Sequence, residues 1–412
     1  MKSFCKSSIT KNTSALFVLQ ILNYVFPLIL LPYLTRILGI QLFGIYVFSI
    51  SIIQLSTIVT DYGFNLSATY AISKNRYDQD YVNTLIGAVY LIKLVLLSLI
   101  WIVLIIFVLS YSKYEDHRLF LSLCIIPIAG MTFQPIWFFQ GIERMKYITL
   151  YTGLAKFSYV VLVILLVKRA DQIVNVALAN GVAQIGAAVI GWYLIVRLGY
   201  SPKVPSRTFL KKTFMESLPF FWSRAAVATY TTAGSFYLGI FAAPTQVAIF
   251  SASEQLYKAA QNAFMPLIQS LYPFMANKPD FPLFFRILAA VTIFTTMVCG
   301  IGYYFSPIAI KLIYGNEFSS AYGVFKIFLV MMILTVPSMM LGYPFLGALG
   351  KANLANTSVI IAGILQIILL SCLYFMNLVS AVWVAVSIII VELAVLLLRI
   401  KYGLNNFKLS TQ

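Results

Sequence analysis

Charged side chains are scarce in this sequence, and their scarcity excludes a soluble globular protein. Only 10% of the 412 residues are charged, whereas 61% are hydrophobic and the mean hydropathy is +0.91. A protein surrounded by water needs far more surface charge than this composition supplies. Most of the surface is therefore predicted to face lipid.

Residues that carry covalent or metal chemistry are also few. The single histidine, His117, follows Glu115 and Asp116 in a short hydrophilic stretch, which is typical of a solvated surface histidine. Most of the four cysteines lie inside apolar runs, so no extracellular disulfide framework is predicted. The sequence also lacks a nucleophile beside a base, a metal-binding cluster and a glycine-rich phosphate loop. We therefore expect no enzyme activity, cofactor, metal or ATP hydrolysis.

Lysine and arginine outnumber the acids by 29 to 12, which gives a net charge of +17. A basic excess can indicate nucleic-acid binding, but in membrane proteins the basic residues collect in cytoplasmic loops. Here they concentrate in alternate hydrophilic segments, starting with the N-terminal one. This pattern predicts that both termini are cytoplasmic, and it indicates no nucleic-acid partner.

Long apolar runs recur from one end of the chain to the other. A helix needs about 20 mostly apolar residues to cross the ~30 Å hydrocarbon core, because lipid offers its backbone no hydrogen-bond partners. The first run is long, contains Pro27 and Pro32 and is followed directly by a second, so no cleavable signal peptide is expected. The sequence predicts an all-α polytopic membrane protein with about twelve spans, at residues 13–35, 39–61, 82–109, 118–139, 147–167, 173–198, 214–240, 245–275, 283–305, 322–345, 352–375 and 379–400.

The predicted spans divide into two halves. The loop at residues 199–213 carries Pro202, Pro205 and several basic residues, and it lies near the middle of the chain. Sliding the chain against itself by 204 residues places residues 44–46 on residues 248–250 and brings later span starts into register. Parallel repeats of this kind build many transporters. We predict two six-helix lobes, at residues 1–205 and 206–412.

Prolines occupy matched positions in the two halves. The fourth predicted span of the first half contains Pro127 and Pro135, and the fourth of the second half contains Pro337 and Pro344. Proline removes a backbone hydrogen bond and bends a helix. We therefore expect bends at equivalent places in both halves.

Five segments of the chain resemble a known family. They read PYLTRILGIQLFGIY (Pro32 to Tyr46), DYGFNLSATYAIS (Asp61 to Ser73), IWFFQGIERMKYIT (Ile136 to Thr149), SLPFFWSRAA (Ser217 to Ala226) and EQLYKAAQNAFMPLIQSLYP (Glu254 to Pro273). Together they resemble the Wzx-type O-antigen and polysaccharide flippases of the multidrug, oligosaccharidyl-lipid and polysaccharide exporter superfamily.

The resemblance implies a fold and a function. The fold would be MATE-like, and the substrate would be an undecaprenyl-pyrophosphate-linked oligosaccharide, moved from the cytoplasmic to the outer leaflet of the bacterial inner membrane. The partners would be this lipid-linked oligosaccharide, membrane lipids and other proteins of polysaccharide assembly.

Several ionisable residues lie near the middle of predicted spans, where they are costly and usually functional. Four of them are cations, Lys93, Lys156, Arg224 and Lys258, and two are acids, Glu254 and Glu392. A pyrophosphate is attracted strongly by cations in a partly desolvated site. These cations are therefore predicted to line a substrate cavity and to bind the head group.

Some of these residues could have a structural role and no contact with substrate. Lys93 has a long stem and could extend to the membrane interface. Glu254 and Lys258 are four residues apart and could neutralise each other on one helix face. Arg224 has no such neighbour, and its face continues through Thr231 and Ser235 as a polar stripe.

The shift of 204 residues also pairs neutral polar residues with cations. It places Gln20 on Arg224 and Gln54 on Lys258. We therefore expect the C-terminal lobe to hold the charged head group, while Gln20, Asn23 and Gln54 form hydrogen bonds with sugar hydroxyls.

Two acids are candidates for coupling transport to protons. Desolvation disfavours the charged form of a carboxylate inside a span unless a cation lies nearby. Glu254 has Lys258 one turn away, whereas the nearest cation to Glu392 on its own helix is Arg399, about 10 Å along the axis. Glu392 is therefore the predicted proton carrier, although protonation or bonding to another helix for packing would equally explain its position.

Two other functional classes stay open. A drug or cation antiporter of the same superfamily would concentrate acids in its lumen, contrary to the excess of cations here. A membrane polymerase or ligase of polysaccharide assembly would have a large outer loop, whereas the outer loops here are short.

The favoured mechanism is alternating access, in which two lobes rock about a central cavity.

Overall fold

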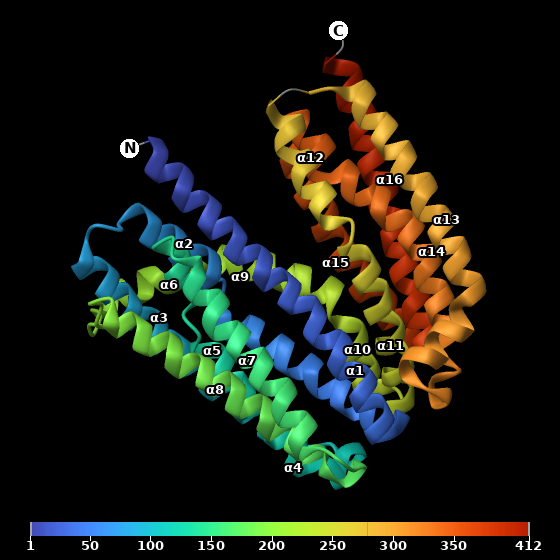
Figure 1. The fold of residues 1–412 in the computed structure, drawn as a ribbon, viewed down its shortest axis with the longest axis horizontal. Coiled ribbons are helices and arrows are strands. Elements are labelled where there is room, and N and C mark those ends of the chain that lie inside the picture. Colours follow the sequence, from blue (N-terminus) through green and yellow to red (C-terminus); the bar gives the residue numbers. More distant parts are fainter. Residues whose placement is uncertain (1, 278, 411–412) are drawn as a thin grey trace. The chain divides into compact units, whose positions relative to one another are not determined.

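The computed structural model describes the backbone of residues 2–277 and 279–410, with the side chains of residues 2–25, 27–28, 229–231 and 407–410 outside the description. Throughout this part of the chain the elements are helices joined by short connections, with no strand (Figure 1). This confirms the predicted all-α class. Two compact units emerge: unit 1 contains Met1–Leu38 and Ser49–Ala225, and unit 2 contains Gly39–Phe48 and Ala226–Gln412.

Unit 1 is built from long helices and short broken ones. Its helices are α1 (Lys2–Asp61, of which Gly39–Phe48 belongs to unit 2), α2 (Phe64–Lys74), α3 (Gln79–Ser110), α4 (Arg118–Ser122), α5 (Ile125–Phe133), α6 (Ile136–Gly141), α7 (Met145–Leu166), α8 (Ile173–Arg197) and most of α9 (Arg207–Thr231). Helix α8 packs against α5 and α7, and α2 packs against α6. Glycine permits the closest of these approaches, because a Cβ atom on Gly130 of α5 would lie 2.5 Å from the carbonyl carbon of Gln184.

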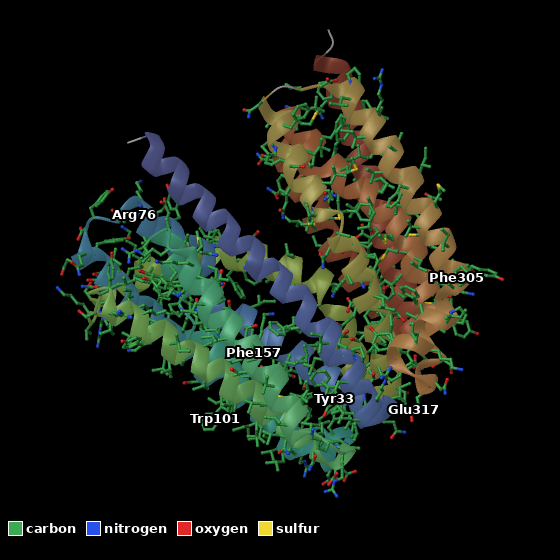
Figure 2. The ribbon with its side chains drawn as sticks, in the orientation of Figure 1. Tyr33, Arg76, Trp101, Phe157, Phe305 and Glu317 are labelled. Atoms are coloured by element: carbon green, nitrogen blue, oxygen red, sulfur yellow. The ribbon has the colours of Figure 1, made fainter. Side chains whose placement is uncertain are left out.

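Unit 2 is a second helical bundle. Its helices are α10 (Ala233–Phe241), α11 (Pro244–Asn262), α12 (Met265–Asn277), α13 (Phe281–Tyr314), α14 (Ala321–Met340), the π-helical segment η4 (Leu341–Leu346), α15 (Ala352–Phe375) and α16 (Ala381–Ser410). Helix α14 lies at its centre and packs against α11, α13 and α16. The outer helix α13 is exposed for most of its length, and Phe305 projects outward from it (Figure 2). Such an apolar surface fits lipid and not water.

The segment Gly39–Phe48 packs in unit 2, although the residues on both sides of it belong to unit 1. Helix α1 is interrupted at Gly39, whose φ of 69° suits glycine. The backbone N–H of Ile40 donates a 3.1 Å hydrogen bond to Glu317, which is labelled in Figure 2. Phe43 also packs edge-on against Phe318. The sequence did not predict this exchange of a segment between the two halves.

Eight described helical segments are long and apolar enough to cross a membrane, or nine if the bent pair Ser112–Ser122 and Ile125–Gly141 is one span. The remaining predicted spans are residues 13–35, whose side chains lie mostly outside the description, and residues 214–240 and 245–275, which are α9 with α10 and α11 with α12. A total of twelve spans and the lobe boundary after residue 205 stay predictions. The span predicted at 39–61 ends where α1 ends, at Asp61, and the short helix α2 follows after the turn at Tyr62 and Gly63.

Both units contain interrupted helices at corresponding places. In unit 1 the chain breaks at Tyr62 and Gly63, which have φ angles of 49° and 79°, and again between α5 and α6 next to Pro135. In unit 2 it breaks between α11 and α12 and at η4, where Gly342 is non-helical and Pro344 follows. The fourth predicted span of each half is therefore interrupted near its second proline, as expected from the sequence.

Candidate functional site

Lys93 lies inside unit 1 and is 2% exposed, near the middle of α3. Its Nζ atom donates a 2.9 Å hydrogen bond to the carbonyl oxygen of Thr132 and lies 3.8 Å from Oδ1 of Asp61. The side chain therefore does not extend to an interface. Its charge is directed at the carboxylate of Asp61, the last residue of α1.

Two buried threonines complete this cluster. The hydroxyl of Thr132 lies 2.8 Å from that of Thr60 and 2.7 Å from the carbonyl oxygen of Ile128. Thr60 and Thr132 are 0% and 2% exposed. Asp61, Lys93 and the two threonines thus form a connected polar cluster inside an apolar bundle, where each polar group needs a partner.

The other predicted groups of unit 1 are more accessible. Lys156 is half-buried on α7, and Gln54 is exposed on α1. Arg224 is exposed on α9, and within the described part of the chain it makes no ion pair. A guanidinium of this kind is available to an anion, and its planar fork suits a phosphate group.

Some predicted residues cannot be placed. The side chains of Gln20, Asn23 and Thr231 lie outside the described residues. Ser235, the other member of the predicted stripe on the face of Arg224, is 9% exposed in α10. The predicted contacts of these four residues with substrate therefore stay predictions.

Glu254 and Lys258 meet on α11. The Lys258 Nζ atom lies 2.8 Å from Oε1 of Glu254, and their side chains are 45% and 15% exposed, respectively. The pairing expected from their spacing is therefore present, and it holds the ammonium toward an accessible position. Lys258 retains enough exposure to approach an anion while Glu254 orients it.

Glu392 is 7% exposed on α16, and Arg399 follows two turns later on the same helix. The Nη1 atom of Arg399 donates to the carbonyl oxygen of Ser338 at 2.7 Å, and its Nε atom donates to the hydroxyl of Ser358 at 3.0 Å. Arg399 is thus an internal cation of unit 2. The only indication of this in the sequence was its position on the same predicted helix as Glu392, seven residues away.

Metal binding has no candidate site among the residues that the structure describes, since no group of three or more His, Cys, Asp or Glu side chains converges there. The polar chemistry available consists of fixed cations, carboxylates and hydroxyls inside apolar helices. Such groups can bind an anionic head group, hydrogen-bond to sugars or exchange a proton.

Comparisons with known proteins agree with these features. The family model described as "Polysaccharide biosynthesis protein" matches residues 9–278. A protein of Escherichia coli (strain K12) named as a candidate O-antigen transporter is 31% identical over 269 residues, and the match covers 65% of each chain. The chain thus matches less than two thirds of the length of this relative.

Solved structures show the same fold. The structure titled lipid II flippase MurJ, in an inward closed conformation, has a TM-score of 0.74 and 12% identity, and the match covers 97% of this chain and 91% of that one. An inward-facing multidrug transporter of the MATE family has a TM-score of 0.67 and 14% identity, with 94% and 96% covered. The MATE-like fold predicted from the sequence is therefore confirmed. Since the family model matches more than half of the chain, this protein belongs to the polysaccharide biosynthesis protein family.

Proposed function

We propose that this chain is a flippase for a lipid-linked oligosaccharide of the O-antigen type, which it moves from the cytoplasmic to the outer leaflet of a bacterial inner membrane. The observation that carries the proposal is the 31% identity, over 269 residues, to a candidate O-antigen transporter. The fold shared with a lipid II flippase agrees with it. The names of both relatives refer to transport or flipping.

The charge distribution supports an anionic substrate. Arg224 is exposed on α9, Lys156 is half-buried on α7, and Lys258 is accessible beside Glu254. We propose each of these cations as a candidate to contact the pyrophosphate, because charge-assisted hydrogen bonds to phosphate are strong in partly desolvated surroundings. Gln54 is accessible on α1 and is assigned to sugar hydroxyls, as are Gln20, Asn23, Thr231 and Ser235 from their sequence positions.

Alternating access is the proposed mechanism, because the polar head group cannot cross lipid unaided while the apolar tail is soluble in it. Both termini are assigned to the cytoplasm from the distribution of Lys and Arg. Glu392 is the first candidate for proton coupling, with Glu254 as the second. Other proteins of polysaccharide assembly are proposed partners.

The direct test follows the lipid-linked intermediate. The protein is depleted in its host, and the oligosaccharide accessible on each leaflet is labelled with a membrane-impermeant reagent. Accumulation on the cytoplasmic leaflet is expected, with recovery when the wild-type chain is restored. An unchanged distribution between leaflets, at confirmed depletion, contradicts the flippase function.

Drug or cation antiport is the second candidate, because the multidrug transporter of the MATE family has a similar fold. The test is the efflux of cationic dyes from cells that express the chain. Dye efflux without any change in the leaflet distribution of lipid-linked oligosaccharide would favour the antiporter. A polymerase or ligase would instead form or break glycosidic bonds in purified lipid-linked oligosaccharide, which a flippase leaves chemically unchanged.

A further inference from the structure

Two helices of unit 1 end inside the bundle, where a positive charge can interact with their last carbonyl groups. Helix α1 ends at Asp61, and Tyr62 and Gly63 turn the chain through left-handed conformations. Helix α5 ends at Phe133, and Pro135 then supplies no N–H group. The last carbonyl groups of a helix lack intrahelical partners, and in a membrane water does not replace them.

The ammonium of Lys93 lies where these two helix ends meet. It donates to the Thr132 carbonyl in the last turn of α5 at 2.9 Å, and it lies 3.8 Å from the carboxylate of Asp61, the last residue of α1. The C-terminal end of a helix carries partial negative charge. Two helix ends and a carboxylate therefore converge on a single side chain that is 2% exposed.

The neighbouring hydroxyls extend this oxygen-rich environment. Thr132 and Thr60 approach each other at 2.8 Å between their hydroxyl oxygens, and both are buried. Main-chain carbonyls at the ends of broken helices coordinate ions in membrane transporters, and here the Asp61 carboxylate and two hydroxyls lie beside such a carbonyl. A lysine ammonium, with three donors and no acceptor, satisfies the same set of oxygens.

The aligned positions in the other half of the sequence carry none of these residues. The shift of 204 residues places Met265, Met297 and Val336 on Asp61, Lys93 and Thr132. The corresponding region of unit 2 also contains a helix break, between α11 and α12. The cluster is therefore not repeated at the aligned positions, and in unit 2 a different cation, Arg399, donates to a main-chain carbonyl near the break at Gly342.

We propose that Asp61, Thr132 and Thr60 form a monovalent-cation site whose resident cation is the tethered ammonium of Lys93, and that this cation positions the two broken helices of unit 1. Lys93 is thus a positioning residue of the transporter and not a ligand of its substrate. The site would accept a free primary ammonium ion of matching size once the lysine side chain is removed.

The test is chemical rescue of Lys93→Ala in the purified full-length chain. This substitution removes three methylene groups and the ammonium, so propylammonium matches the lost atoms. Thermal unfolding in detergent is followed with propylammonium, with tetramethylammonium as a cation without N–H donors, and with 1-propanol as a neutral molecule of similar shape. We expect propylammonium alone to raise the unfolding temperature of Lys93→Ala, by about 2–4 °C or more, as a substantial regain of stability would.

Wild type and Lys156→Ala are the matched controls. Lys156 is a half-buried lysine on α7 that is not part of the cluster, so neither protein should respond to propylammonium. Equal responses of Lys93→Ala to all three additives, or an equal response of Lys156→Ala to propylammonium, overturn the proposal. This readout does not depend on transport, so it stands or falls separately from the flippase function.

A second measurement applies if Lys93→Ala does not accumulate. Asp61→Asn, Lys93→Met and the double variant are compared by thermal unfolding in membranes. Because each single variant leaves one charge without its counter-charge, the double variant should be at least as stable as the less stable single variant. Strictly additive losses from the two single changes contradict a shared cation site.

Discussion

Arg399 of α16 donates a 2.7 Å hydrogen bond to the carbonyl oxygen of Ser338, shortly before the non-helical Gly342 interrupts the same helical segment. In unit 1, Lys93 donates in the same way to the carbonyl of Thr132, shortly before the break at Pro135. Each unit thus uses a cation to satisfy a main-chain carbonyl in its interrupted fourth predicted span. The two cations come from different helices, so the carbonyl next to the break is bound by an unrelated residue in each half.

The first prediction concerns the role of Arg399 in stability. Arg399→Ala should destabilise the protein by about 1.5–3 kcal/mol, because hydrogen bonds from a charged donor to Ser338 and Ser358 are lost. Thermal unfolding of the purified chain measures this loss. Lys401→Ala, an exposed position on the same helix, is the control and should leave stability unchanged. Equal unfolding temperatures for the two variants would show that the Arg399 contacts contribute nothing.

The second prediction concerns close helix packing in unit 1. A Cβ atom on Gly191 of α8 would lie 2.6 Å from the Cδ atom of Pro135, whose rigid ring has little room to move. Gly191→Ala should therefore destabilise the protein by about 1–3 kcal/mol through overpacking.

Gly186 provides a matched control on the same helix. A Cβ atom there would meet nothing within 4 Å, so Gly186→Ala should be neutral or slightly stabilising, as alanine favours helix. Both variants are compared by thermal unfolding. A destabilisation of Gly186→Ala as large as that of Gly191→Ala argues against the packing explanation.

The third prediction tests the cations assigned to the substrate. Arg224→Ala and Lys258→Ala should each reduce surface glycan several-fold at equal protein abundance, since each removes a charged donor to the pyrophosphate. Lys211→Ala, an exposed position on the same helix as Arg224, is the control. Wild-type glycan levels in both substrate-site variants would remove the cations from the binding site.

The apolar runs predicted much of the fold, because a continuous lipid-facing helix leaves a pattern that tertiary packing does not override. The span predicted at 352–375 coincides with α15, and those at 147–167 and 173–198 agree closely with α7 and α8. Spans in the more polar segments were harder to predict. Helices α9 and α11 carry charged residues, and α10 and α12 are short, so length and hydropathy alone do not identify these helices as spans.

The partners of the buried charges were not predictable from spacing along the chain. Asp61 was predicted at the end of a span and is the last residue of α1, but nothing along the chain indicated its partner. It meets Lys93, which is on another helix. Glu254 and Lys258 were predictable because both lie on one helix, four residues apart.

The last prediction concerns proton coupling through Glu392. This carboxylate is 7% exposed in unit 2, and the nearest cation along its own helix, Arg399, donates hydrogen bonds to Ser338 and Ser358. A buried carboxylate inside a span often takes part in proton transfer, so a change of its surroundings during transport would shift its protonation. Glu392→Gln imitates the protonated form and should largely abolish the dependence of flipping on a pH gradient in reconstituted vesicles. Glu254→Gln is the control: it removes the acidic partner of Lys258 and should weaken substrate binding while the pH-gradient dependence of the remaining transport persists. If Glu392→Gln flips substrate with the pH-gradient dependence of wild type, Glu392 is not the coupling carboxylate.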